Sequence, residues 1–102
     1  MSAYLLTPIA EQDLSDLLDF IASESSIDTA LKVEVAFRDE FIKLAELPGM
    51  GHYREELLSR QYRFSSIYSY VIVYRWETVP IQIVAILHGT RNLNALLRRR
   101  IR

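Results

Sequence analysis

Cysteine is absent from the 102 residues of this chain. Its absence excludes disulfide bonds, thiolate metal sites and cysteine nucleophiles, and it favours a cytoplasmic protein, because the cytoplasm is reducing. Long hydrophobic runs are missing too, since segments such as Ile83 to Leu87 reach only five residues. A membrane-spanning helix needs about 20 apolar residues. The N-terminus has no basic region of the kind that opens a signal peptide, so we expect no contact with a membrane.

Basic residues are scarce in the first half of the chain, and acidic residues are scarce in the second half. Residues 1–50 hold ten acidic and only three basic residues, a net charge of −7, whereas residues 51–102 hold three acidic and nine basic residues, a net charge of +6. This asymmetry predicts a basic face on the C-terminal half that meets an acidic partner. The alternative is that the basic residues only neutralise the acidic helices nearby.

Glycine and proline are sparse, with three of each, and they mark the ends of predicted elements. Thr7-Pro8 is typical of a helix start, because threonine caps the first turn and proline fits the first helical position. Pro48-Gly49 ends a second helix near Leu47. Two apolar stripes at helical spacing predict an αα-hairpin: Leu14, Leu17, Leu18 and Ile21, then Ala30, Val33, Phe37, Phe41 and Leu44.

The C-terminal half changes to β-branched and aromatic runs. We predict a strand at Ala3 to Leu6, strands at Gln61 to Ser65, Tyr68 to Trp76 and Ile81 to His88, and a last helix from Arg91 to Ile101. Strict alternation would put Ile81, Ile83, Ala85 and Leu87 on one face of the last strand. Both sheet faces are substantially apolar, so the C-terminal segment, a partner, or both must cover the second one.

The predicted order is therefore β-α-α-β-β-β-α within one domain over residues 1–102. This is an α+β fold in which a helical hairpin packs on a small, mainly antiparallel sheet and a C-terminal helix follows.

Four segments, in this order, resemble the RelE/ParE toxin superfamily, and specifically its ParE or plasmid-stabilisation branch. They are DLSDLLDFIA in the first helix, FRDEFIKLAELPGMGHYREEL across the second helix and its loop, YRFSSIYSYVIVYR in the hairpin, and VAILHGTRNLNALL near the end. The resemblance covers nearly the whole chain. It implies a RelE/ParE-like fold and a type II toxin–antitoxin module, in which a ParD-like antitoxin binds the toxin and prevents growth inhibition. It also implies DNA gyrase as the target, whereas RelE-type relatives cut mRNA in the ribosome.

RNA cleavage needs groups that move protons and stabilise a charged phosphorane. RelE-like relatives supply lysines and arginines on the sheet and a tyrosine near the C-terminus. Here no lysine follows Lys43 and no tyrosine follows Tyr74. We therefore expect a protein that is not an enzyme, with a ribosome-dependent endoribonuclease as the alternative. In that alternative, His88, Arg91 and Arg63 would carry the reaction, although His88 more simply fixes the corner after its strand.

Cofactor and metal sites are not expected. Two histidines 36 positions apart without cysteines form no recognised ligand set. Asp13, Asp16 and Asp19 recur at three-residue steps, which is typical of a solvated helix face. HGTRN lacks the glycine pattern of a phosphate-binding loop.

Binding surfaces are the stronger expectation. Arginines pair bidentately with carboxylates, and aromatic residues anchor interfaces. The candidates for antitoxin contact are Arg60, Arg63, Tyr70, Arg75, Trp76 and Arg91. The candidates for target contact lie in the last helix: Leu93, Leu96, Leu97, Arg98, Arg99 and Arg100. Because the whole chain has a net charge of −1, we expect these residues to contact a protein rather than to bind nucleic acid by sequence.

Overall fold

A computed structural model describes residues 3–101, and its elements follow the predicted order. The helices are α1 (Pro8–Glu24), α2 (Ile27–Glu46) and α3 (Leu93–Arg100), with a short 3-10 turn η1 (Pro48–Met50) after α2. The strands are β1 (Tyr4–Leu6), β2 (Tyr62–Ile67), β3 (Tyr70–Arg75) and β4 (Ile81–His88). None of the described helices is long and apolar enough to cross a membrane.

Side chains cap all three helices at the N-terminal end. The Thr7 hydroxyl accepts from the Ala10 amide at 3.2 Å, and Pro8 follows it at the first helical position, as the sequence predicts. Ser26 caps α2 in the same way through the Thr29 amide. Asn92 caps α3 through the Ala95 amide. Each cap supplies an acceptor to an amide that has no partner within its own helix.

The four strands form one mixed sheet in the order β1-β4-β3-β2. The β2–β3 and β3–β4 pairings are antiparallel, whereas β1 runs parallel to β4. β1 pairs only with residues 81–83, so α1 rather than a strand borders the rest of that edge of β4. The predicted meander is thus confirmed, with one short parallel strand added at its side.

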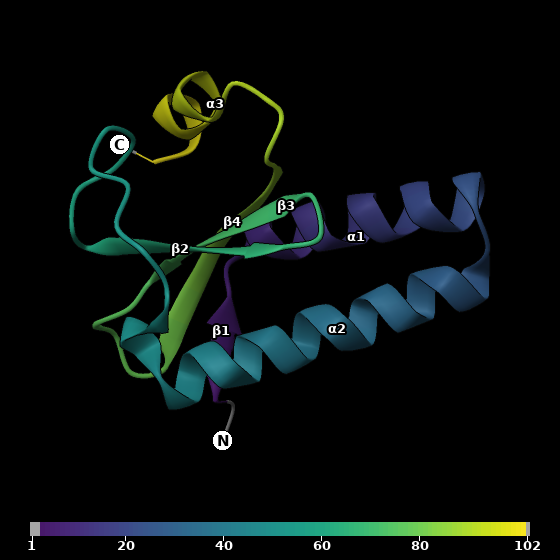
Figure 1. Ribbon diagram of the computed structural model, residues 1–102, viewed down its shortest axis with the longest axis horizontal. Helices are drawn as coiled ribbons and strands as arrows, with labels where there is room; N and C mark the ends of the chain where they lie inside the picture. The colour runs from purple at the N-terminus through teal and green to yellow at the C-terminus, as the bar shows by residue number, and fades with distance from the viewer. Residues whose placement is uncertain (1–2, 102) are drawn as a thin grey trace.

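Two apolar cores lie on opposite faces of the sheet. The larger core packs α1 and α2 on one face, with Phe37, Phe41 and Leu44 fully buried against Ile72 and Tyr74. On the other face, α3 packs Leu93 and Leu97 on Val73, with help from residues of the loop before β2. Figure 1 shows α3 on one side of the sheet and the helical hairpin on the other. The C-terminal segment therefore covers the second apolar face.

The predicted alternation along β4 is wrong beyond Ile83. Tyr74 pairs with Ile83 but Val73 pairs with Ala85, so Val84 is an extra residue in β4. Such a bulge reverses the side-chain faces that follow it. Ile81, Ile83 and Ile86 consequently belong to the core under the helical hairpin, whereas Ala85 and Leu87 belong to the core under α3.

Candidate functional site

One group of predicted binding residues lies where β2 begins and β3 ends. We call Tyr53, Arg60, Arg63 and Trp76 the arginine–aromatic cluster. The Arg63 guanidinium carbon lies 4.1 Å from the ring centre of Tyr53 and 4.3 Å from that of Trp76. Arg60 stacks on the same tyrosine at 4.6 Å, and its carbonyl accepts from the Trp76 indole N–H at 2.8 Å. The fold brings together three of the residues that the sequence predicts for antitoxin contact: Arg60, Arg63 and Trp76.

Within this cluster, Arg63 serves the fold more than the surface. One of its terminal nitrogens donates to the Gly51 carbonyl at 2.8 Å, and its Nε is buried without a hydrogen-bond partner. A guanidinium held between two rings and tied to a backbone carbonyl has little freedom to pair with a carboxylate of another protein. Arg60 differs, because its side chain is 68% exposed and pairs only with the exposed Glu55.

Tyr74, which is buried in the core, holds the loop between α2 and β2 in place. Its hydroxyl donates to the Pro48 carbonyl at 2.7 Å and accepts from the Gly51 amide at 2.9 Å. Burial raises the pKa of the Tyr74 phenol, and the Gly51 amide opposes this shift by favouring the phenolate. The loop that carries Tyr53 is therefore anchored at one end by Tyr74 and across its middle by Arg63.

Replacing Tyr74 by phenylalanine tests this anchor. At neutral pH we expect the free energy of unfolding to fall by about 1–3 kcal/mol, because the buried Gly51 amide and the Pro48 carbonyl each lose a partner. The wild-type protein also depends on pH. A phenol whose folded pKa lies above its unfolded value stabilises fully below the unfolded pKa, near 10, and that stability is lost as pH rises further.

The difference in free energy of unfolding between the wild type and Tyr74→Phe should therefore become smaller above pH 10, as urea denaturation at several pH values would show. Tyr68→Phe is the matched control, since its ring is exposed. Parallel losses of stability in wild type and Tyr74→Phe above pH 10 would contradict the role given to burial.

A second group lies at the opposite end of β3, around His88. The histidine Nδ1 is 2.6 Å from the Thr90 hydroxyl, and its Nε2 is 3.4 Å from the Ser69 hydroxyl. The ring of Tyr70 meets it edge-on at 5.2 Å between centres. The Thr90 contact is local, and the other two join the end of β4 to the start of β3. Together they fit a histidine that fixes the corner between β4 and α3. Arg91 follows at this corner and is exposed.

The three residues of the nuclease alternative do not form one site. Arg63 pairs with Tyr74, whereas His88 pairs with Tyr70. Tyr70 and Tyr74 are four positions apart in β3, which is about 13 Å along a strand. Only His88 and Arg91 are neighbours, and no described carboxylate pairs with His88 to activate it.

A groove of about 410 Å³ runs from this corner between α1 and α3. Asp13 lies in it, and one carboxylate oxygen, Oδ2, accepts both from the Ile86 amide at 3.0 Å and from Arg100 at 2.5 Å. The Asp13 side chain is only 9% exposed. It therefore closes the edge of β4 that β1 leaves open and ties α3 to α1.

Asp13 corrects the prediction that all three aspartates of α1 lie on a solvated face. Asp16 and Asp19 are exposed, but Asp13 points into the groove. A usable signal was present in the sequence: Asp13 stands three residues after Ala10 and four before Leu17, and both of those are buried. A residue on that face of a helix lies toward the core.

The predicted target-binding residues of α3 divide into two sets. Leu93 and Leu97 are 7% and 1% exposed because they cover the sheet, so they are not surface residues. Arg100 is engaged by Asp13. Arg98 and Arg99 are exposed, and Leu96 is half-buried beside them.

Arg75, predicted for antitoxin contact, is half-buried at the end of β3 opposite Tyr62.

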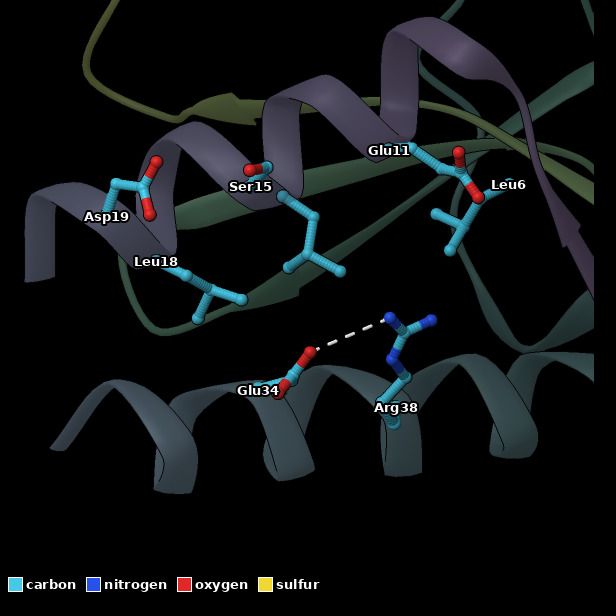
Figure 2. Close-up of a pocket in the computed structure, with 8 residues that line it drawn as sticks. Leu6, Glu11, Ser15, Leu18, Asp19, Glu34 and Arg38 are labelled. Carbon is cyan, nitrogen blue, oxygen red and sulfur yellow. Dashed lines mark ion pairs between the residues drawn. The ribbon is translucent and has the colours of Figure 1, made fainter. Parts of the chain in front are cut away.

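Between α1 and α2 lies a cleft of about 260 Å³, drawn in Figure 2. Leucines form its apolar part, and Glu11, Asp19 and Glu34 line it with carboxylates. Arg38 is its one arginine, paired with Glu34 at 3.7 Å and donating to the Tyr4 hydroxyl, whose hydrogen bond raises the pKa of Arg38. The exposed acidic charge of the chain is thus concentrated on the helical hairpin.

Metal ligation has no geometric support in residues 3–101, where no three histidine or carboxylate side chains lie close enough together to hold an ion. What the described surface offers is contact area: exposed arginines toward the C-terminal half, an acidic cleft on the hairpin, and a groove between α1 and α3.

Comparison with known proteins shows which family and fold the chain shares. A solved structure described as the chromosomal ParDE TA system from P. aeruginosa has the same fold, with a TM-score of 0.71 and 20% sequence identity. The alignment covers 86% of this chain and 96% of that one. No curated protein sequence matches the chain. A family model matches residues 4–93, and its family is the ParE toxin of the type II toxin–antitoxin system parDE. This chain therefore belongs to the ParE toxin family.

Proposed function

We propose that this chain is a toxin that a ParD-like antitoxin neutralises by direct binding, and that it inhibits DNA gyrase, and so replication, without being an enzyme. The family match over residues 4–93 carries the proposal. The surface supports it, because the residues that a nuclease would use lie at opposite ends of β3.

Charge favours the C-terminal half as the antitoxin site. An acidic antitoxin segment would be repelled by the carboxylates of the cleft between α1 and α2 and attracted by the exposed arginines of the other half. Arg60 is the leading contact, with Trp76 beside it, and Arg91 and Tyr70 offer a second point at the far end of β3. Arg63 acts by holding Tyr53 and Trp76 in place.

The target contact falls to the exposed part of α3. Arg98 and Arg99 project from a helix whose other side is fixed on the sheet by Leu93 and Leu97. A rigid support suits recognition, because little side-chain and backbone freedom is lost on binding. Compartment follows from the target, since gyrase acts on DNA in the cytoplasm.

Gyrase supercoiling by purified toxin, with and without the cognate antitoxin, is the decisive experiment. We expect inhibition that the antitoxin reverses. The double substitution Arg98→Glu and Arg99→Glu should weaken gyrase inhibition by roughly tenfold or more while antitoxin affinity is kept. Arg60→Glu should weaken antitoxin binding while gyrase inhibition is kept. Each variant is thus the control for the other.

Failure of the toxin to inhibit supercoiling at any concentration would overturn the gyrase target. If induction instead produced codon-phased mRNA cuts that His88→Ala abolished, the ribosome-dependent nuclease would be the function. Unaffected growth on induction, with antitoxin binding kept, would indicate a toxin that has lost its activity.

A further inference from the structure

The outward side of α2 carries an apolar stripe that nothing in residues 3–101 covers. Ile27, Leu31, Val35 and Ile42 are 71%, 55%, 59% and 43% exposed. At about 100° per residue these four side chains fall within an arc of roughly 80° on the helix. The arc also holds Arg38, whose guanidinium is turned to Glu34 and the Tyr4 hydroxyl. The core-facing residues of α2 lie on a different arc: Ala30, Phe37, Phe41 and Leu44. Helix α2 therefore has two apolar faces, and the described part of the chain covers only one of them.

A row of alternating charge runs beside this stripe. Asp28, Lys32, Asp39 and Lys43 occupy the next arc of about 60°. None of these four is in an ion pair within the described chain, whose pairs involve other residues. From Asp28 to Lys43 the row has two charges of each sign, and Glu46, which falls at the same angle as Asp28, ends it at the last residue of α2. Over the span from Asp28 to Lys43 the row therefore selects a partner by pattern and not by net charge.

The pattern is complementary to itself. If two α2 helices lie antiparallel with a twofold axis between Val35 and Ala36, Asp28 falls opposite Lys43 of the second copy and Lys32 falls opposite its Asp39. Each pair occurs twice because the axis repeats it. In antiparallel helix packing, flanking residues on the same side of the apolar seam meet one another. Four opposite-charge pairs then border a seam made of the exposed stripe.

We propose that this face of α2 binds a second copy of the same chain, giving a twofold-symmetric toxin dimer through α2. From Ile27 to Ile42 the stripe extends about 22 Å, enough for one helix–helix contact. Figure 1 shows α2 at the margin of the molecule, with α3 on the other side of the sheet, so the dimer leaves the arginines of α3 free.

A second copy fits this face better than an acidic antitoxin does. The cleft beside the stripe is lined by Glu11, Asp19 and Glu34, and Arg38, which lies within the arc of the stripe, is already paired with Glu34. An acidic segment gains nothing from this surround. A copy of α2 brings lysines and aspartates in matching order.

Sedimentation velocity of the full chain over a range of concentrations tests the dimer. We expect a concentration-dependent dimer, weakened roughly tenfold or more by Leu31→Asp, because a carboxylate would enter the apolar seam. Phe20→Asp is the matched control: Phe20 is 60% exposed but lies on α1, so its replacement should leave the dimer intact. Circular dichroism checks that both variants fold.

Charge exchange tests the register. Lys32→Asp alone should weaken the dimer by placing two aspartates opposite each other, and Lys32→Asp combined with Asp39→Lys should restore it. Since the chain has no cysteine, Val35→Cys adds a single thiol near the axis, and we expect it to form an intermolecular disulfide faster than Phe20→Cys.

A monomer at every concentration would overturn the proposal, as would a dimer that Leu31→Asp leaves unchanged. If the chain is a monomer and Leu31→Asp abolishes antitoxin binding, the stripe is an antitoxin surface and the proposal is likewise wrong. Loss of gyrase inhibition has no bearing on these outcomes, so the dimer and the proposed function can fail separately.

Discussion

Replacing Asp13 by alanine should lower the free energy of unfolding by about 3–4 kcal/mol, measured by urea denaturation. The carboxylate is nearly buried and satisfies two donors, the Ile86 amide and the Arg100 guanidinium. Removing one member of a buried ion pair costs about 3–5 kcal/mol, because the other charge loses its partner. Arg100 is 28% exposed and can reach water, which places the expectation at the lower end of that range.

The same substitution should loosen α3. Asp13 links α1 to the last turn of α3, and this helix is otherwise held by the packing of Leu93 and Leu97, with Leu96 and Ile101 partly buried beside them. Amide hydrogen exchange over residues 93–100 should therefore accelerate more than exchange in α2. Asp16→Ala is the matched control, because Asp16 is exposed and bonds only to Gln12. We expect it to change stability by less than about 0.5 kcal/mol. Equal effects of the two substitutions would refute the role of Asp13.

The fold follows from the sequence wherever one local signal suffices. Thr7-Pro8 begins α1, and an apolar stripe read at helical spacing finds the buried face of α2. The order of strands follows from short β-branched runs separated by turns. The failure in β4 has a physical cause: Val84 is an extra residue opposite β3, and alternation carries no mark of a bulge.

The site is harder to predict, because its contacts join residues that are distant in sequence. The sequence predicts Arg63 as a surface contact because arginines pair with carboxylates, but its stacking needs Tyr53 on one side and Trp76 on the other. Likewise, Asp13 meets Arg100 across 87 positions. Residue type fixes what a side chain can do, and only the fold decides whether another protein or this chain uses it.

Gly51→Ala is the second substitution with a large expected effect, and backbone strain has no part in it. Gly51 has φ of −71° and ψ of −179°, which any residue adopts. A β-carbon there would lie 2.5 Å from the Tyr74 hydroxyl and 2.8 Å from the Phe64 carbonyl oxygen. The Phe64 backbone is held in β2 and bonded to His52, so the loop must move instead.

That movement breaks the hydrogen bonds that Tyr74 makes to Pro48 and Gly51. Overpacking costs about 1–3 kcal/mol, and buried groups left without partners add about 1–3 kcal/mol. We therefore expect Gly51→Ala to lower the free energy of unfolding by about 3–5 kcal/mol.

Gly49→Ala provides the control, because the nearest atom to its added β-carbon is 4.0 Å away. We expect it to be neutral or to stabilise slightly by restricting the unfolded chain. Gly89→Ala should fall between the two, since its β-carbon would lie 3.2 Å from the Ser69 carbonyl oxygen. If stability followed any other order among the three glycines, close approach of the loop to Tyr74 would not be the reason for glycine at position 51. If the expected order holds, the surface that carries Tyr53 and Arg60 depends on a close contact at position 51, where glycine is needed because no side chain fits.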